Sequence, residues 1–466
     1  MRRYIMLVPL LLFLTTASWA QDLWVHGFVT AVDSPSSFEI DDYKITRDPA
    51  LVLKIEKLKS DRSATVFRPK DIRVGTDVEV EGDYDEITHE LRAHAIKVFL
   101  FDTVEINRLA LLEKPPLLEK GPSGKWHGVL FADGLRVDVS DATEVTVKPN
   151  KTEIEAAKAK GKVRPEQPYP LSSLDEVNLD TFVQYKGSPQ PDGSVLASSV
   201  QFEHEEIEEG EARHFSSWAP RVKAPDYVRA KPGKLKEPGK SYKLSSDKEA
   251  QEYVSRLGSS LIPDHQKDLP AGNPLKIPFQ FFLAINKSPE VNGYSTGTVI
   301  VNSGVFGALE NEAQLAYFLS SEMASSFEHQ WWRDMEYHKV KIRAVEAGQI
   351  ILGFPGNFVL GSIANDYLTN DEFARSLANQ RDRIALEWML ASGYDICQAP
   401  LAWKASSLKH VSRESPFWDI YDMRRSYLTA QLKIHYSDVD CSSLKKDSEE
   451  FKRVAQHMKE VGQKKK

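Results

Sequence analysis

Residues 311–325 have the sequence NEAQLAYFLSSEMAS, and this stretch decides how the C-terminal half of the chain is interpreted. Its apolar residues recur at helical intervals, so we expect a helix through this region. A helix brings residues i and i+4 onto one face. Ser321 and Ser325 therefore share a face, and Glu322 follows the first of them.

Two metal ligands at this helical spacing are typical of zinc peptidases. In the pattern His-Glu-x-x-His, the two histidines bind the metal and the glutamate activates its bound water. Here Ser321 and Ser325 occupy both histidine positions, and Glu322 occupies the position of the glutamate. A neutral hydroxyl is a far weaker zinc ligand than an imidazole. The helix thus has the general base but lacks two ligands.

The surrounding sequence, from about Pro278 to Asp395, resembles zinc peptidases of the HtpX and CAAX-prenyl-protease type. The resemblance implies a buried strand at 278–285, a glycine-bearing edge strand, and then the helix that holds the metal. The motifs that carry it are NGYSTG at 292–297, VIVNSGVF at 299–306, NEAQLA at 311–316, Asp382, and MLASGYD at 389–395.

The resemblance also implies the position of the third metal ligand. In the family this ligand is a glutamate four residues before the aspartate that Asp382 matches, and Ala378 stands there. A methyl group donates no lone pair. With Ser321, Ser325 and Ala378 at the ligand positions, we expect no metal cofactor. Glu322 would then be a remnant general base without a zinc-bound water to deprotonate.

These substitutions predict a catalytically inactive, peptidase-like protein that binds an extended peptide or an envelope protein. Tyr294, Ser295, Thr296 and Gly297, on an edge strand that continues to Val301, are the expected binding residues, because strand addition uses backbone groups and needs no zinc. The alternative is an active zinc metalloendopeptidase with non-standard ligands. In a third possibility the N-terminal modules carry the function by binding envelope components or saccharides.

Two other patterns are rejected as sites. Glu328, His329, Glu336 and His338 have the atom types of a substitute metal site, but their spacing matches no zinc pattern, so we expect them on the flank of a continuing helix. Residues 293–297 match Gly-x-Ser-x-Gly, which in serine hydrolases lies between a strand and a helix. Here a β-rich segment follows, so we expect no nucleophile.

The N-terminus has the pattern of an export signal. Arg2 and Arg3 precede a short apolar stretch at 4–14, and residues 18–20 offer a cleavage point after Ala20. We therefore expect a signal peptide at 1–20, a periplasmic or secreted protein, and no transmembrane span in the mature chain. An uncleaved anchor is the alternative, although the apolar stretch is short for one.

The mature chain contains two cysteines, Cys397 and Cys441. In an oxidising compartment they are able to pair, but the sequence does not place them within bonding distance, and free buried thiols fit it equally well. The net charge of −7 gives no reason to expect nucleic acid as a partner. The sequence does not indicate the oligomeric state.

The first two hundred residues suggest an internal repeat. Trp24-Val25-His26-Gly27 opens one segment, Trp126-His127-Gly128 opens another, and each closes with alternating apolar and polar residues around a turn. The pattern resembles small β-barrel domains of the oligonucleotide/oligosaccharide-binding type. His26 and His127 are expected to be repeated with the fold and to form no site.

The predicted fold class is multidomain, with two small β-barrel modules followed by a mainly helical α+β metallopeptidase-like domain. A chain of 466 residues with 41% hydrophobic content can bury several cores. The apolar stretch at 348–368 is expected to form a buried helix pair or a lid. The predicted segments after the signal peptide are modules at 21–103 and 126–204, linkers at 104–125 and 205–245, the metallopeptidase-like domain at 246–441, and a solvated, charged tail at 442–466.

Overall fold

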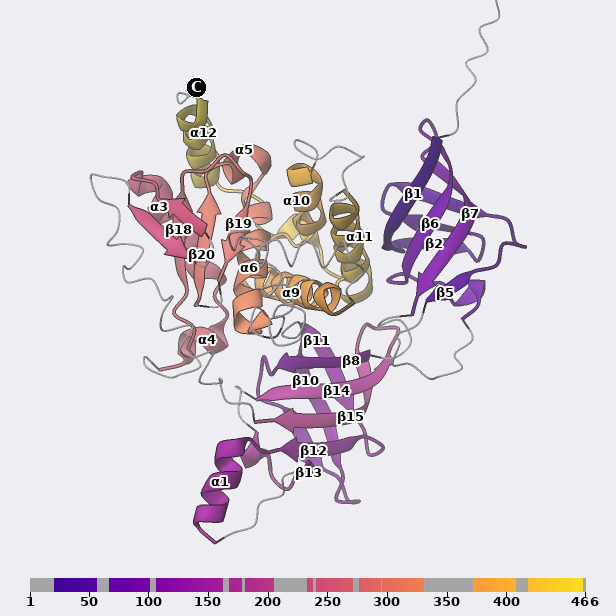
Figure 1. Cartoon of the computed structure of the whole chain (residues 1–466), viewed down its shortest axis with the longest axis vertical. Helices are drawn as coiled ribbons and strands as arrows, with labels where there is room; N and C mark the ends of the chain where they lie inside the picture. The colour runs from indigo at the N-terminus through magenta and orange to yellow at the C-terminus, as the bar shows by residue number, and fades with distance from the viewer. Residues whose placement is uncertain are drawn as a thin grey trace, which may run out of the picture.

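The computed structural model describes residues 21–56, 67–100, 106–161, 167–177, 181–204, 233–237, 240–270, 276–294, 296–330, 333, 372–407 and 418–463. They form two β modules and a C-terminal unit in which helices surround a small sheet (Figure 1). The expected signal peptide and the apolar stretch at 348–368 lie outside the described residues. None of the helices within the described ranges is long and apolar enough to span a membrane.

Module 1 is a seven-stranded sheet in the order β1-β6-β7-β4-β3-β2, with β5 also paired to β7. β4 and β5 run parallel to β7, and β6 runs antiparallel to it. Alternating apolar residues such as Val78 and Val80 are fully buried, as expected for a half-buried strand. The elements are β1 Gln21–Phe28, β2 Ala31–Ser34, β3 Ser37–Ile40, β4 Tyr43–Arg47, β5 Lys54–Glu56, a 3₁₀ turn Pro69–Asp71, β6 Asp77–Asp85 and β7 Glu90–Phe99.

Module 2 is an eight-stranded sheet in the order β13-β12-β15-β11-β10-β9, in which β14 joins β15 to β8. β11 and β12 run parallel to β15, and β14 runs antiparallel to it. The elements are β8 Ile106–Leu111, β9 Leu117–Lys120, β10 Trp126–Ala132, β11 Leu135–Val139, β12 Glu144–Lys148, α1 Lys151–Ala159, β13 Tyr169–Pro170, a 3₁₀ turn Leu174–Glu176, β14 Phe182–Pro189 and β15 Val195–Glu203.

The two modules repeat the same seven-strand pairing in the same chain order. β1 to β7 of the first correspond to β8, β9, β10, β11, β12, β14 and β15 of the second. A register shift occurs at Glu81/Gly82 in β6 and at Lys186/Gly187 in β14. A Cβ at Gly82 would lie 2.1 Å from the Arg92 carbonyl oxygen, and one at Gly187 would lie 2.3 Å from that of Leu196. Glycine is therefore required at both bulges.

The repeat begins earlier in module 2 than the sequence suggests. The Trp24-containing segment forms β1, whose counterpart is β8, whereas the Trp126-containing segment forms β10, the counterpart of β3. Aligning the two tryptophan segments is therefore wrong. As a result, residues 106–111 and 117–120, expected within a linker at 104–125, form strands of the second sheet. In the described residues neither sheet closes into a barrel, because the strand pairings leave free ends.

His26 and His127 are not equivalent, contrary to expectation. His26 lies in β1, where it is buried and stacks on Phe99. Its Nε2 is within hydrogen-bond distance of Oδ1 of Asp77, at 2.9 Å. His127 lies in β10, where it is partly exposed and pairs with Glu119 at 3.1 Å. The expected repetition with the fold is wrong, because these histidines stand on strands that do not correspond.

The C-terminal unit is α+β, as the sequence predicts for this region. Its strands are β16 Lys234–Glu237, β17 Lys240–Lys243, β18 Gln280–Ala284, β19 Val291–Gly293 and β20 Thr298–Asn302. Its helices are α3 Lys248–Leu261, α4 Asp264–Asp268, α5 Val305–Ala308, α6 Glu312–Phe327, α9 Glu372–Ala391, α10 Gln398–Ser407, α11 Trp418–His435, a 3₁₀ turn Cys441–Ser443 and α12 Glu449–Gln463.

The small sheet has the order β18-β20-β19, with β18 parallel and β19 antiparallel to β20. β20 is therefore the central strand, and its five residues are all buried. The expectation that the stretch to Val301 is an edge strand is wrong, because Val299 pairs with Phe281 on one side and Gly293 on the other. A fully apolar strand of this kind belongs in the middle of a sheet.

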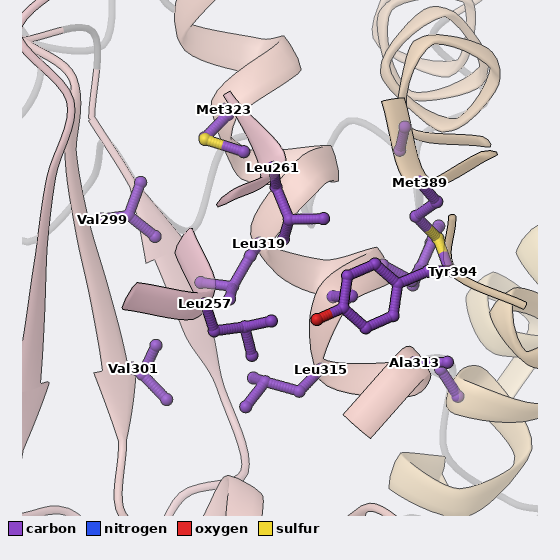
Figure 2. Packing of buried hydrophobic residues seen from close by; sticks show 14 of the residues in the cluster. Leu257, Leu261, Val299, Val301, Ala313, Leu315, Leu319, Met323, Met389 and Tyr394 are labelled. Carbon is purple, nitrogen blue, oxygen red and sulfur yellow. The ribbon is translucent and has the colours of Figure 1, made fainter. Parts of the chain in front are cut away.

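The helix predicted from residues 311–325 lies at the centre of the largest core. Figure 2 shows Leu315 and Leu319 of α6 between Val299 and Val301 of β20 and the side chain of Tyr394. α6 also packs along α9 and α10. A helix that is apolar on most sides is expected to be enclosed in this way.

Two segments expected to be solvated are packed instead. Within the predicted linker at 205–245, β16 and β17 form a hairpin, and Leu235 and Tyr242 are buried against β18 and β20. The predicted tail forms α12, in which Phe451 and Met458 are buried in the main core. Apolar residues at helical intervals among the charges of 449–463 explain this packing.

Candidate functional site

The candidate site is built on α6, whose start is fixed by Asn311. The Asn311 side chain accepts a hydrogen bond of 3.1 Å from the Gln314 backbone N–H, as an N-cap residue does. Its amide also donates to Gln398 of α10 at 2.9 Å. These bonds fix the register of α6, and therefore the direction in which Ser321, Glu322 and Ser325 point.

The three expected ligand positions lie on α6 and α9, two helices that pack against each other. Ser321 is buried, Ser325 is half-buried, and Ala378 of α9 is 3% exposed. Ala378 lies one turn before Arg381, whose guanidinium approaches α6, so both residues are on the same side of α9. On these two neighbouring helices the expected ligand positions carry two hydroxyl groups and one methyl group.

Glu322 is engaged by neighbouring groups on both carboxylate oxygens. Its Oε2 accepts a hydrogen bond of 2.8 Å from the backbone N–H of Gly293 in β19. Its Oε1 lies 3.7 Å from Nη1 of Arg381. The two side chains are 18% and 14% exposed, respectively. A guanidinium therefore supplies positive charge beside the carboxylate that would stand next to zinc in a peptidase of the resembled type.

Tyr294, Thr296 and Gly297, three of the expected peptide-binding residues, lie between β19 and β20. The Tyr294 N–H donates to Thr298 at 2.9 Å, and the Gly297 N–H donates back to Tyr294 at 2.8 Å, with Gly297 at φ +82°. Tyr294 and Thr296 are buried, and Ser295 lies outside the described residues. The Gly-x-Ser-x-Gly sequence is followed by a strand, β20, whereas in serine hydrolases the motif leads into a helix.

Further contacts tie this turn to α6 and to the β16–β17 hairpin. The Ser326 hydroxyl of α6 donates to the Tyr294 carbonyl at 2.8 Å. The Tyr294 hydroxyl is 2.7 Å from the hydroxyl of Tyr242 in β17. These bonds hold the end of β19 against the helix that carries Glu322.

Other residues of the motifs that carry the resemblance to zinc peptidases form buried structural contacts. Asp382 of α9 accepts from the Tyr317 hydroxyl at 2.7 Å and from Arg424 Nε at 3.0 Å. Glu312, in the first turn of α6, accepts from the Tyr394 hydroxyl at 2.8 Å and pairs with Lys445 at 2.5 Å. These carboxylates join α6 to α9, α11 and the C-terminal segment.

The charge of Glu312 is stabilised by its partners. Burial alone would raise the pKa of Glu312, but hydrogen bonds from Lys445, Ser448 and Tyr394 outweigh burial and hold the pKa below its usual value. Burial raises the pKa of Tyr394 to about 12, with Lys445 opposing the rise. The network therefore keeps Glu312 ionised and Tyr394 protonated at neutral pH.

The two described members of the possible substitute cluster, Glu328 and His329, contact module 2. Both oxygens of Glu328 are 3.2 Å from the Leu111 backbone N–H of module 2, and Oε2 is 3.2 Å from Arg333. The ring of His329 makes an edge contact with Phe182, also in module 2. Both side chains therefore contact a neighbouring unit, while Glu336 and His338 lie outside the described residues.

Cys397 and Cys441 form a disulfide with a Cα–Cα distance of 6.1 Å, which answers the question left open by the sequence. The bond joins the start of α10 to the segment before α12. Within the described residues, Asp395 with these two cysteines is the one acidic, thiol or imidazole group close enough for metal binding. Because the sulfurs are bonded to each other, this group offers no thiolates to a cation.

Sequence reasoning missed Arg381 as part of the site. The available signal was its position three residues after Ala378 on a helix, which places the two on adjacent parts of one face. Whether that face meets Glu322 depends on how α9 packs against α6, which the sequence pattern does not specify.

Comparisons with known proteins give partial similarities. Residues 26–97, in module 1, match the family model "Domain of unknown function (DUF5666)". The beta-barrel assembly-enhancing protease of Escherichia coli (strain K12) is 26% identical over 160 residues, covering 33% of this chain and 31% of that protein. The putative beta-barrel assembly-enhancing protease of Vibrio cholerae is 22% identical over 181 residues, covering 37% and 36%. The chain thus spans about a third of the length of these relatives, a weak similarity to a peptidase.

Proposed function

We propose that this chain is a peptidase-like protein of the cell envelope that has lost metal-dependent catalysis and acts by binding a peptide or another protein. One observation carries the proposal: within a single peptidase-like segment, structural carboxylates such as Glu312 and Asp382 remain in buried networks, while Ser321, Ser325 and Ala378 occupy the ligand positions. The scaffold is therefore maintained and the metal-binding groups are replaced. Zinc peptidases of the HtpX and CAAX-prenyl-protease type are its proposed relatives.

The local chemistry of Glu322 supports a non-catalytic role. A general base needs an accessible water whose pKa is lowered by a metal. Glu322 instead accepts the Gly293 N–H and faces the Arg381 guanidinium. Both interactions stabilise the carboxylate in place as a contact between α6, α9 and β19.

An envelope location is proposed on two further observations. The Cys397–Cys441 disulfide is typical of an oxidising compartment. Residues 1–20 have the charge and hydrophobicity pattern of an export signal. The partial similarity to proteases whose name refers to β-barrel assembly agrees with this location.

β19 is an edge strand of the small sheet, so its outer edge is where we propose that a peptide adds. The Tyr294 N–H donates to the Thr298 carbonyl of β20, and the Glu290 carbonyl accepts from the Asn302 N–H of the same strand. Because backbone groups alternate in direction along an antiparallel strand, those of Val291 and Gly293 point away from β20. The Gly293 N–H does so and is held by Glu322. We propose that an incoming strand pairs at Val291 and competes with Glu322 for the Gly293 N–H.

Metal content and cleavage test the loss of catalysis. The purified full chain is analysed for zinc and incubated with casein, with Glu322→Gln as control. We expect substoichiometric zinc and no cleavage that depends on Glu322. Stoichiometric zinc, together with cleavage that is lost in the variant, would establish instead an active metallopeptidase with non-standard ligands.

A peptide-library screen on the full chain tests binding at β19. Val291→Pro removes one outward N–H, whereas the matched variant Val291→Ala shortens the side chain and keeps that N–H. We expect selected peptides to lose affinity for the proline variant and to retain it for the alanine variant. Equal affinity for both variants, or a screen that yields no ligand, would rule out strand addition at this edge.

A further inference from the structure

A cavity of about 150 Å³ lies where the two β modules meet α9 and α11. Module 1 contributes the loop before β6, module 2 contributes β8 and the β14–β15 turn, and the C-terminal unit contributes both helices. The polar lining residues that matter here are Arg73, Arg108, Asn379, Arg383, Gln431 and His435. No single unit forms this cavity, so it exists only in the assembled chain.

The wall of the cavity is positively charged. Among the residues that the structure describes, its lining includes three arginines and no acidic side chain. Arg108 and Arg383 both pair with Asp133 behind the wall, each at 2.5 Å. Two guanidinium groups of the lining thus contact one carboxylate that stands outside the lining, in a partly dehydrated space. Such a wall attracts anions, because charge interactions strengthen as water is excluded.

Two buried amides of the lining have no hydrogen-bond partner among the described residues. Asn379 of α9 is 8% exposed and Gln431 of α11 is 7% exposed. Neither side chain makes a hydrogen bond, and Oε1 of Gln431 is fully buried. Buried polar side chains nearly always have a partner in native proteins. Their unused amide groups therefore point to a ligand with hydrogen-bonding oxygens.

His435 adds a neutral imidazole to the wall. Burial, together with the charges of Arg383 and Arg108, lowers the pKa of His435 to about 4, while Asp192 acts in the opposite direction. Asp192 itself accepts hydrogen bonds from the Ser194 N–H and hydroxyl at 3.0 and 2.8 Å. At neutral pH the ring keeps one N–H donor, and no hydrogen bond to the described residues occupies it.

We propose that this junction cavity binds a small anion that carries a carboxylate or phosphate group. Guanidinium groups recognise both oxyanions through paired N–H donors, and the Asn379 and Gln431 amides and the His435 ring add neutral donors. A cavity of about 150 Å³ holds a molecule of roughly benzene's size, so the ligand has few heavy atoms. Because the walls come from all three units, the bound anion bridges them.

Binding is tested on the full chain with sodium acetate and sodium phosphate, against sodium chloride at the same ionic strength. Calorimetry should show saturable binding of at least one oxyanion. In the salt of that oxyanion, the Tm of the protein should be higher than its Tm in sodium chloride. Acetate binding alone identifies a carboxylate site, and phosphate binding alone identifies a phosphate site. Equal behaviour in all three salts would overturn the proposal.

Matched variants locate the binding. Gln431→Met removes the cavity amide and keeps the size of the side chain, whereas Gln456→Met makes the same change on the exposed side of α12. We expect at least a tenfold loss of oxyanion affinity for the first variant and none for the second. The proposal fails if Gln431→Met is folded by circular dichroism and binds as tightly as the natural chain.

A measurement on the natural chain does not depend on the folding of any variant. The imidazole NMR signals of His435 should shift during titration with the bound oxyanion. The signals of His94, which is exposed and paired with Asp83 in module 1, should remain in place. Saturable binding that leaves the His435 signals unchanged would place the anion elsewhere and overturn the proposal.

Discussion

At the scale of single residues, Glu322, the proposed remnant of a general base, makes structural contacts through both carboxylate oxygens. In a zinc peptidase the carboxylate would be balanced by the metal, whereas here Arg381 and the Gly293 N–H provide the compensating positive charge. A half-buried carboxylate without any partner would be costly, and these two contacts reduce that cost. These contacts give Glu322 a structural role that agrees with the proposed loss of catalysis.

Glu328 is expected to make the stability of the chain depend on pH. Burial raises the pKa of Glu328 to about 8, although Arg333 opposes the rise. A folded pKa above the unfolded value means that the native state holds the proton more tightly. The stabilising contribution is therefore complete below pH 4.5, the ordinary value, and is lost as pH rises through about 8.

Urea unfolding of Glu328→Gln from pH 5 to 9 measures this effect. Between these limits the free energy of unfolding of the natural chain should fall relative to that of the variant by up to about 1.4 kcal/mol per pH unit. Glu155→Gln, an exposed change on α1, should run parallel to the natural chain. If the free energy of unfolding of Glu328→Gln also changes with pH in parallel with that of the natural chain, the Glu328 carboxyl does not have a raised pKa.

The sequence predicted the residues of the candidate site where local spacing was sufficient. The positions of Ser321, Glu322 and Ser325 depend only on the helical repeat, and the structure places all three on α6. Pairing between distant segments was less predictable: the partner Arg381 was missed, and the Cys397–Cys441 bond was left open. These contacts depend on how α9 and the C-terminal segment pack, which no local pattern encodes.

At the scale of elements, the two β modules show what sequence alternation can and cannot determine. Alternation and the closing turns correctly indicated two similar β modules. It did not identify β8 as the first strand of module 2, because strand equivalence depends on the pairing order. Likewise, the family resemblance implies an edge strand that continues to Val301, although the fully buried residues of β20 fit a central strand.

The bulge glycine of β6 is predicted to be essential for module 1. In Gly82→Ala, the added Cβ would lie 2.1 Å from the Arg92 carbonyl oxygen, and the neighbouring backbone cannot move without breaking β7. We expect a loss of at least about 2 kcal/mol in the free energy of unfolding, measured by urea denaturation.

Gly307→Ala is the matched control, because a Cβ at this position in α5 would meet nothing within 4 Å. It should be neutral or stabilising by up to about 1 kcal/mol, as expected for alanine in a helix. Gly187→Ala, at the equivalent bulge of module 2, should resemble Gly82→Ala. A loss at Gly82 no larger than that at Gly307 would argue against a steric requirement at the bulge.

At the scale of the whole molecule, α9 and α11 join both β modules to the C-terminal unit. Arg375 of α9 pairs with Asp77 of module 1 at 3.1 Å, and both side chains are 3% exposed. The Ser426 hydroxyl of α11 accepts the Phe28 N–H of the same module at 2.9 Å. Module 2 is bound through Asp133 and Arg383. The units predicted to be separated by linkers are thus in direct contact through buried charges.

Asp133 is the residue on which this assembly should depend most. It is fully buried, pairs with Arg108 and Arg383, and accepts from the Tyr185 hydroxyl at 3.0 Å. It also has φ +66°, a conformation that asparagine tolerates as well as aspartate. Asp133→Asn therefore removes the charge with little change in backbone preference, and leaves two buried guanidinium groups without their shared counter-charge.

Removing one partner of a buried charge network typically costs about 3–5 kcal/mol. We expect Asp133→Asn to lose stability in this range, and limited proteolysis to cut between module 2 and α9 before either unit unfolds. Asp141→Asn, an exposed change in the same module, should stay within about 0.5 kcal/mol of the natural chain. If Asp133→Asn unfolds at the same denaturant concentration as Asp141→Asn, apolar contacts and not this ion network hold the units together.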